Sequence, residues 1–170
     1  MSQRDSGYER KERDLYETPA WVTEALLPHV PGDILEIWEP ACGSGKMVRA
    51  LENAGFTVHA TDIDQGDDFL GDMIPYAASI ITNPPYALAT PFIEMALFRG
   101  EFVAMLLRTD FDHAKTRSRL FAECPSFAKK VVLTKRIQWF EDSRGSPSFN
   151  HAWFIWDHRH KGAPTLAYAP

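Results

Sequence analysis

The 170-residue chain is 45% hydrophobic and 24% charged, an ordinary composition for a single soluble globular domain. Its longest strictly apolar stretch, Phe102 to Leu107, is six residues long, far short of the run of about 20 that spans a membrane. The charged N-terminus lacks an apolar signal segment, so we expect a cytoplasmic protein. Cys42 and Cys124 lack metal-ligand spacing, and we expect two reduced thiols and no metal site.

The net charge of −5 argues against a protein that binds any nucleic acid through charge alone, but the charges are unevenly distributed. Residues 1–107 contain 7 basic and 17 acidic residues, whereas residues 108–170 contain 11 basic and 6 acidic ones. Ordinary solvated surface charge is one interpretation. The other is a two-ended molecule, with an acidic half that holds a cofactor and a basic half that binds a polyanion.

Residues 1–13 are polar and have no apolar period, so we expect a flexible arm before a single domain at residues 14–170. A helix with one apolar face follows at residues 21–27. Thr18 is predicted as its N-cap and Pro19 as its first residue. The turn at residues 28–32 ends this helix.

A strand–glycine loop–helix unit comes next in the chain. Residues 34–38 predict a buried strand, residues 39–45 form a loop with glycines at 43 and 45, and a helix runs from about Lys46 to Ala54 before Gly55. Such loops let the backbone approach a ligand at a helix N-terminus, although Gly-x-Gly alone is weak evidence.

Asp62 follows the second predicted strand, residues 56–60, and lies 17 positions after Gly45. That offset is close to the roughly 20 residues at which a carboxylate binds ribose hydroxyls in nucleotide-binding α/β folds. The linker at residues 65–70 is too short for a normal crossover helix, so we expect few strands on that side of the sheet.

A short β-branched strand at residues 79–82 ends at Asn83-Pro84-Pro85-Tyr86, because two prolines stop ladder pairing. The Asn83 Oδ1 and the Pro84 carbonyl are placed to accept two N–H bonds from a flat amine, with Tyr86 covering its face. A strand-ending turn with a surface tyrosine is the alternative interpretation.

Further elements are predicted along the rest of the chain. They are a helix at 91–98, a strand at 102–107, a basic segment at 112–121 anchored by Leu120 and Phe121, a strand at 130–140, a loop at 141–150, and an aromatic strand at 151–157 that pairs antiparallel with the strand before it.

Taken together, these motifs resemble those of class I S-adenosylmethionine-dependent amino methyltransferases, in the order of the gamma-type DNA N6-adenine enzymes. The motifs are Tyr16 to Pro19, Glu39 to Gly45, Asp62, Asp68 to Leu70, and Asn83 to Tyr86. The segments 38–43 and 153–157 are also similar to small phage and prophage adenine methyltransferases. The resemblance implies an α/β, Rossmann-like fold with a seven-stranded, mostly parallel sheet, an antiparallel C-terminal hairpin, and helices on both faces.

The resemblance also implies a set of residues that bind S-adenosylmethionine. Beside the methionine part it places Tyr16, Thr18, Pro19, Glu39, Ala41, Gly43 and Gly45. It assigns the ribose hydroxyls to Asp62, the adenine face to Ile63, and the adenine edge to Asp68 and Phe69. Asp64 or Asp67 is an alternative to Asp68, because the linker is short.

For catalysis the resemblance implies Asn83, Pro84 and Tyr86, with Pro85 beside the substrate. Because the amine proton becomes acidic only after methylation, no dedicated general base is expected. A base flipped out of a duplex would be sandwiched between Tyr86 and either Phe140 or Trp139, which are equally well explained as hairpin core. Phosphate contacts are expected from Arg108, Lys115, Arg117, Arg119, Lys135, Arg136 and Arg144.

The expected partner is DNA, with RNA possible, in a bacterial or phage-infected cell, and the protein is expected to be a monomer or homodimer without a membrane partner. The sequence shows no separate target recognition domain. RNA adenine or guanine N-methylation, protein glutamine N-methylation, and a non-catalytic module that only binds cofactor or DNA are the alternative functions.

Overall fold

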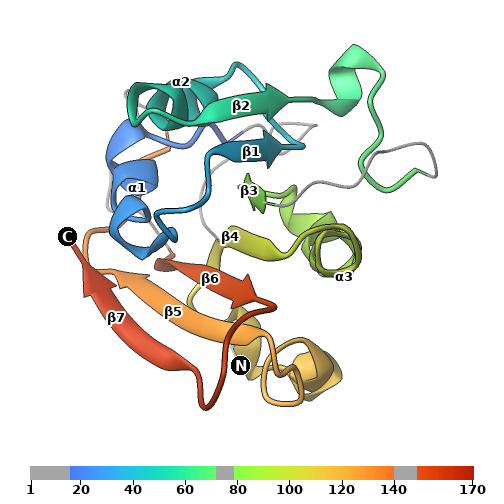
Figure 1. Cartoon of the computed structure of the whole chain (residues 1–170), viewed down its shortest axis with the longest axis vertical. Helices are drawn as coiled ribbons and strands as arrows, with labels where there is room; N and C mark the ends of the chain where they lie inside the picture. Colours follow the sequence, from blue (N-terminus) through green and yellow to red (C-terminus); the bar gives the residue numbers. More distant parts are fainter. Residues whose placement is uncertain (1–15, 72–78, 140–148) are drawn as a thin grey trace.

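The structure is a computed structural model that describes residues 16–71, 79–139 and 149–170 (Figure 1). Its strands are β1 (Glu36–Glu39), β2 (Thr57–Ala60), β3 (Ser79–Thr82), β4 (Phe102–Arg108), β5 (Phe127–Leu133), β6 (His151–Asp157) and β7 (Thr165–Ala169). Its α-helices are α1 (Ala20–Glu24), α2 (Lys46–Asn53) and α3 (Ala89–Arg99). The remaining described residues form short 3₁₀ turns and loops.

One seven-stranded sheet joins these strands in the order β2-β1-β3-β4-β6-β5-β7. Strands β1 to β4 are parallel, β6 runs antiparallel to β4 and β5, and β7 is parallel to β5. The expected α/β fold with a mostly parallel sheet and an antiparallel C-terminal hairpin is confirmed. Because the carboxyl ends of parallel strands share one edge of a sheet, the segments after β1, β2, β3 and β4 meet there.

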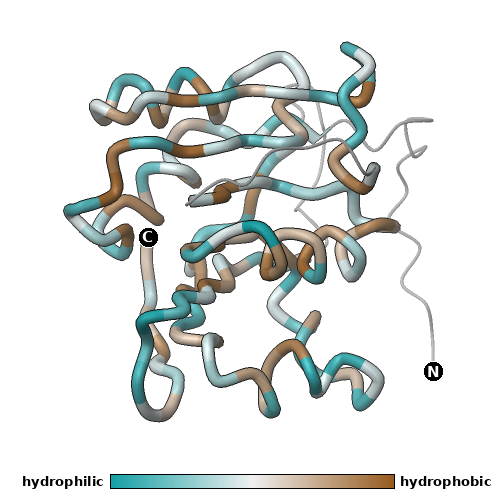
Figure 2. The backbone as a smooth tube through the Cα atoms, turned by 45° about the vertical axis from the view of Figure 1, so that its right-hand side comes forward, coloured by the Kyte–Doolittle hydropathy of each residue, from teal (hydrophilic) through white to brown (hydrophobic). Residues whose placement is uncertain are grey.

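Helices cover both faces of the sheet. α1 and α2 pack on one face, and α3 packs on the other together with the 3₁₀ turn Lys115–Leu120 (Figure 1). Along the backbone, hydrophobic stretches alternate with hydrophilic turns (Figure 2). None of the helices in the described segments is long and apolar enough to cross a membrane.

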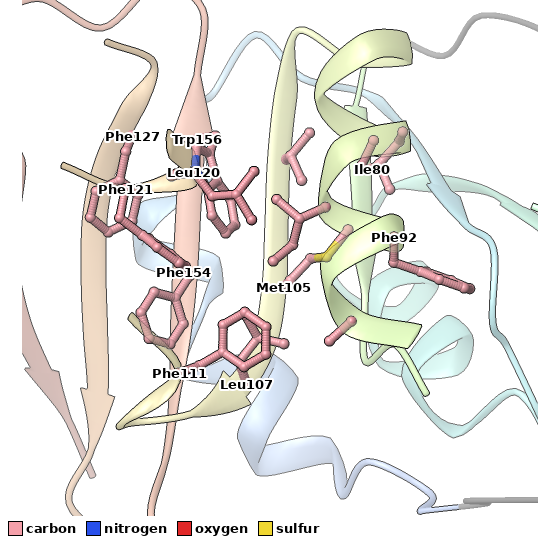
Figure 3. Close-up of a cluster of buried hydrophobic side chains, with 14 of the residues drawn as sticks. Ile80, Phe92, Met105, Leu107, Phe111, Leu120, Phe121, Phe127, Phe154 and Trp156 are labelled. Atoms are coloured by element: carbon pink, nitrogen blue, oxygen red, sulfur yellow. The ribbon is translucent and has the colours of Figure 1, made fainter. Parts of the chain in front are cut away.

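The aromatic strand β6 belongs to the core. Trp156 and Phe154 pack with Phe121 and Phe127 on the α3 side of the sheet (Figure 3). The buried Trp156 Nε1 donates to the Leu120 carbonyl at 2.7 Å, which links the basic segment to β6. On the opposite face Trp153 Nε1 donates to the Val22 carbonyl at 2.8 Å. Both indoles are thus buried with their polar atom satisfied.

The predicted strand at 130–140 is wrong at both ends. β5 begins at Phe127 and ends at Leu133, and the Thr134 amide then donates to the Ala169 carbonyl at 2.8 Å. Ile137 and the half-buried Trp139 still pack on the α1 side of the sheet. The alternating pattern therefore arose from burial of these side chains without strand pairing.

Strand β7 has no counterpart among the elements predicted along the chain. It lies at the edge of the sheet with Leu166 and Tyr168 exposed, and it contains two alanines, which are depleted in strands. Its sequence signal is weak because its backbone pairing with β5, and not side-chain burial, defines it.

The start of α1 differs from the prediction by one residue. Pro19 is extended (φ −62°, ψ 148°) and occupies the N-cap position, so the helix begins at Ala20 and Thr18 does not cap it. Thr18 is instead buried, with 4% of its surface exposed. The end of α2 agrees with the prediction, because Gly55 follows it with a φ of 97°.

Candidate functional site

The loop after β1 is tight and built on glycine. Gly43 and Gly45 have φ values of 51° and 80°, which residues with a Cβ atom rarely adopt. The Cys42 amide donates to the Thr61 carbonyl at 3.1 Å, and the Gly45 amide donates to the Cys42 carbonyl at 2.8 Å. The loop therefore presents backbone, with little side-chain bulk, at the start of α2.

Asp62, directly after β2, holds this loop in place. Its Oδ2 accepts a hydrogen bond from the Gly43 amide at 2.8 Å, and its Oδ1 accepts one from the Asp64 amide at 3.0 Å. The side chain is buried, with 8% of the residue surface exposed. A carboxylate has about four acceptor positions, so two backbone bonds still leave capacity for ligand hydroxyls.

Replacing Asp62 with alanine is expected to lower the free energy of unfolding by about 1–3 kcal/mol, because two partly buried amides lose a charged acceptor. Urea denaturation of the ligand-free protein measures this change. Asp67→Ala is the matched control, since Asp67 is an exposed carboxylate in the same linker. A loss no larger than that of the control would show that Asp62 does not hold the loop.

Glu39, the last residue of β1, is 1% exposed. Its Oε1 accepts hydrogen bonds from the Thr82 hydroxyl at 2.5 Å and from the Ala41 amide at 3.0 Å. Burial raises the pKa of this carboxyl to about 8, and the nearby Asp62 charge adds to that effect. Glu39 thereby connects the glycine loop to the residue that precedes Asn83.

The segment at residues 16–19 crosses both loops. The Tyr16 carbonyl accepts a hydrogen bond from Asn83 Nδ2 at 3.0 Å. Glu17 forms an ion pair with Lys46 at 2.7 Å, and hydrogen bonds from Lys46 and Ser44 lower the pKa of the Glu17 carboxyl. Three motifs that are distant in sequence therefore meet at one edge of the sheet.

Asn83 has its amide orientation set by this contact. Because Nδ2 donates to the Tyr16 carbonyl, Oδ1 is the end of the amide available as an acceptor. Pro84 is buried and Pro85 half-buried, whereas Tyr86 is 45% exposed at the start of the 3₁₀ turn Tyr86–Leu88. The loop thus combines a rigid backbone, an oriented amide and an accessible aromatic face.

Aromatic and basic side chains surround this loop. The Trp139 ring lies 5.4 Å from that of Tyr16 and 5.2 Å from that of His151. The Arg108 guanidinium carbon lies 5.7 Å from the Tyr86 ring centroid. One border of the site is therefore lined by five side chains, which are those of Tyr16, Trp139, His151, Arg108 and Tyr86.

His151 was missed by the sequence analysis. It is the first residue of β6 and pairs with Arg108 of β4, a neighbour that only the antiparallel register reveals. Burial, with a smaller effect from the Arg108 charge, lowers the pKa of its imidazole to about 4. His151 is therefore neutral at physiological pH, and no sequence motif marks it.

The three residues expected at the cofactor adenine differ in exposure, because Ile63 and Asp68 are exposed and Phe69 is buried. Ile63 is 64% exposed, as a residue covering a ligand face requires. Asp68 is exposed, and its Oδ1 accepts from the Leu70 amide at 3.0 Å. The Phe69 ring, by contrast, is 2% exposed and packs between Trp38 and Phe92. The Phe69 ring is therefore part of the core, and the expected contact of this residue with the adenine edge stays a prediction.

Most of the expected phosphate contacts already have partners within the protein. Arg108 pairs with Asp110, Arg119 with Glu94, and Arg136 with Asn150. Arg117 stacks on Phe111 at 3.9 Å, Lys135 lies over Trp21 at 4.9 Å, and Lys115 is exposed. Phe140 and Arg144 lie outside the described residues. The basic half is consequently less free to bind phosphate than its composition indicates.

No protein-family model matches the sequence, and no curated protein matches it. Several solved structures, in contrast, are similar to the structure of this chain. A putative class I S-adenosylmethionine-dependent methyltransferase from Listeria monocytogenes is 13% identical with a TM-score of 0.57, over 88% of this chain and 62% of that one. The methyltransferase subunit of a type I restriction-modification system from Streptococcus thermophilus is 11% identical with a TM-score of 0.59, over 88% and 45%.

The 23S rRNA methyltransferase ErmE is a third similar structure, 16% identical with a TM-score of 0.54, over 82% of this chain and 68% of that one. The chain thus spans less than two thirds of the length of the first two proteins. At these identities the comparisons establish the fold, which is the class I methyltransferase fold.

Proposed function

We propose that this chain is an S-adenosylmethionine-dependent methyltransferase that methylates the exocyclic N6 amine of adenine in DNA. The observation that carries the proposal is the Asn83 amide, whose Nδ2 is held by the Tyr16 carbonyl beside the glycine loop. The class I methyltransferase fold supports it. The similarity to a restriction-modification methyltransferase subunit and to an rRNA methyltransferase supports a nucleic-acid substrate.

The residues after β1 and β2 fit S-adenosylmethionine. The glycine loop supplies close backbone, Asp62 retains acceptor capacity for ribose hydroxyls, and Ile63 offers an exposed apolar face. Glu39 and the residues 16–19 border the same loop and would hold the methionine part. When bound, this cofactor supplies an electrophilic methyl group on a sulfonium.

The chain's own contribution to the reaction is orientation of the amine. An aromatic exocyclic amine is a poor nucleophile, because its lone pair is delocalised into the ring. Hydrogen bonds from its two N–H groups to Asn83 Oδ1 and the Pro84 carbonyl favour a tetrahedral nitrogen whose lone pair points at the methyl group. With the cofactor bound, the nitrogen would take the methyl group as the methyl–sulfur bond breaks to leave a neutral thioether, and the proton then lost from the nitrogen would pass to water.

The proposal is tested by incubating the protein with labelled S-adenosylmethionine and, separately, single-stranded DNA, duplex DNA, RNA and a glutamine-containing peptide. Digestion to nucleosides and mass spectrometry should identify N6-methyladenine from DNA. Methylated adenine or guanine from RNA alone would reassign the substrate. Label in none of the four would contradict the proposal.

Trp139→Ala is expected to raise the KM for DNA about tenfold, if its ring stacks on the extruded base with a typical 1–3 kcal/mol. Steady-state kinetics with saturating cofactor measures the change. Trp139→Phe, which keeps an aromatic face, should recover most of the affinity. Equal KM values for Trp139→Ala and the wild type would assign this indole to core packing against Tyr16 and His151.

A further inference from the structure

Arg108, the last residue of β4, lies in a cluster with three other side chains, which we call the Arg108 cluster: Tyr86, Arg108, Asp110 and Phe149. Its guanidinium carbon is 3.9 Å from the Phe149 ring centroid and 5.7 Å from that of Tyr86. Arg108 Nε donates to Asp110 Oδ1 at 3.1 Å, and Nη2 donates to Oδ2 at 2.8 Å. Tyr86 and Phe149 thus both contact an arginine whose planar pair of donors, Nε and Nη2 (its fork), is bound by the Asp110 carboxylate.

This geometry disfavours Arg108 as a ligand for backbone phosphate. A bidentate carboxylate neutralises the guanidinium and occupies the donor pair that best matches an anion. The remaining property of the group is its flat face, which stacks on aromatic rings. The fork to Asp110 fixes the plane of that face, so the guanidinium is a rigid neighbour for the Tyr86 ring.

Tyr86 needs such a neighbour because it is 45% exposed. Ordering a mobile side chain on binding costs about 0.5–1.5 kcal/mol. A misplacement of the substrate by about 1 Å can lower the rate of reaction about 100-fold. Asn83 and Tyr86 follow the C-terminal end of β3, and Arg108 is the last residue of the adjacent parallel strand β4. The two neighbouring strands therefore bring the arginine next to the ring.

We propose that Arg108 is a positioning residue that holds the Tyr86 ring in the orientation in which the substrate base stacks, and that it makes no phosphate contact. The inference rests on the proposed function and adds to it the group that orients the stacking face. It predicts that charge alone at position 108 is insufficient, because lysine keeps the charge but lacks the planar fork.

The test compares Arg108→Lys, Tyr86→Ala and the double variant by single-turnover methyl transfer at saturating cofactor and DNA. Arg108→Lys should slow transfer about tenfold in the wild-type background and have no further effect in the Tyr86→Ala background, because the arginine acts through that ring. Asp110→Asn, which keeps the arginine but loosens its fork, should slow transfer by a smaller factor. Additive effects in the cycle would overturn the proposal.

A second measurement separates positioning from phosphate binding. The slope of log Kd for DNA against log salt concentration should be unchanged in Arg108→Ala, whereas a lost phosphate contact reduces it by about 0.7–0.9. Lys115→Gln is the positive control for a reduced slope. A reduced slope in Arg108→Ala would overturn the inference while leaving the proposed function intact. A wild-type protein that methylates no nucleic acid would overturn both.

Discussion

Replacing Asn83 with alanine is expected to reduce the rate of methyl transfer by about 100- to 1,000-fold, the usual effect of removing one preorganised hydrogen-bonding group at a reacting centre. The amide is oriented before substrate arrives, because its Nδ2 donates to the Tyr16 carbonyl. Alanine removes both that anchor and the Oδ1 acceptor. Single-turnover kinetics with the nucleic acid that the wild type methylates measures the loss.

Cofactor affinity should remain nearly unchanged in Asn83→Ala, because the glycine loop is held by Asp62 and not by Asn83. Isothermal titration with S-adenosylmethionine checks this. Asn53→Ala, at the end of α2, is a matched control that should transfer at the wild-type rate. Transfer by Asn83→Ala within threefold of the wild type would contradict the assignment of Asn83 as the group that orients the amine.

Replacing Glu39 with glutamine is expected to stabilise the ligand-free protein at pH 8 by on the order of 4 kcal/mol. Burial raises the pKa of Glu39 to about 8, from an ordinary value near 4.5. Between these pH values the folded protein keeps a proton that the unfolded chain has lost. The free energy of unfolding therefore falls as pH rises through this window. Glutamine cannot titrate, so its advantage should be small at pH 4.5, grow up to about pH 8 and then level off.

Urea denaturation at several pH values, for the wild type and Glu39→Gln, measures this difference. Glu36→Gln is the control, since Glu36 is exposed on the same strand and should leave the pH dependence unchanged. Glutamine retains an oxygen that accepts from the Thr82 hydroxyl and the Ala41 amide, so both hydrogen bonds survive. Parallel pH profiles for the two proteins would show that Glu39 is ionised in the folded state.

Sequence patterns predicted the elements whose signals are local. The β-branched run at 79–82, the apolar run at 102–107 and the aromatic run at 151–157 are strands, and α2 ends before Gly55. The patterns failed at residues 134–139, because burial of Ile137 and Trp139 produces the same alternation as a strand. They also missed β7, whose pairing with β5 depends on a partner 36 residues away.

The sequence by itself determined the order of the functional segments, namely a glycine loop after one strand, an aspartate after the next, and Asn83 to Tyr86 after the third. Parallel strands then bring these segments to one edge, which the pattern alone predicts. Only the tertiary structure decided their chemistry: the Asn83 amide is oriented by Tyr16, 67 residues away, and Glu39 is bound by Thr82, 43 residues away. The reason is physical, since propensity acts over a few residues, whereas burial, pKa and hydrogen-bond partners depend on which distant segments pack together.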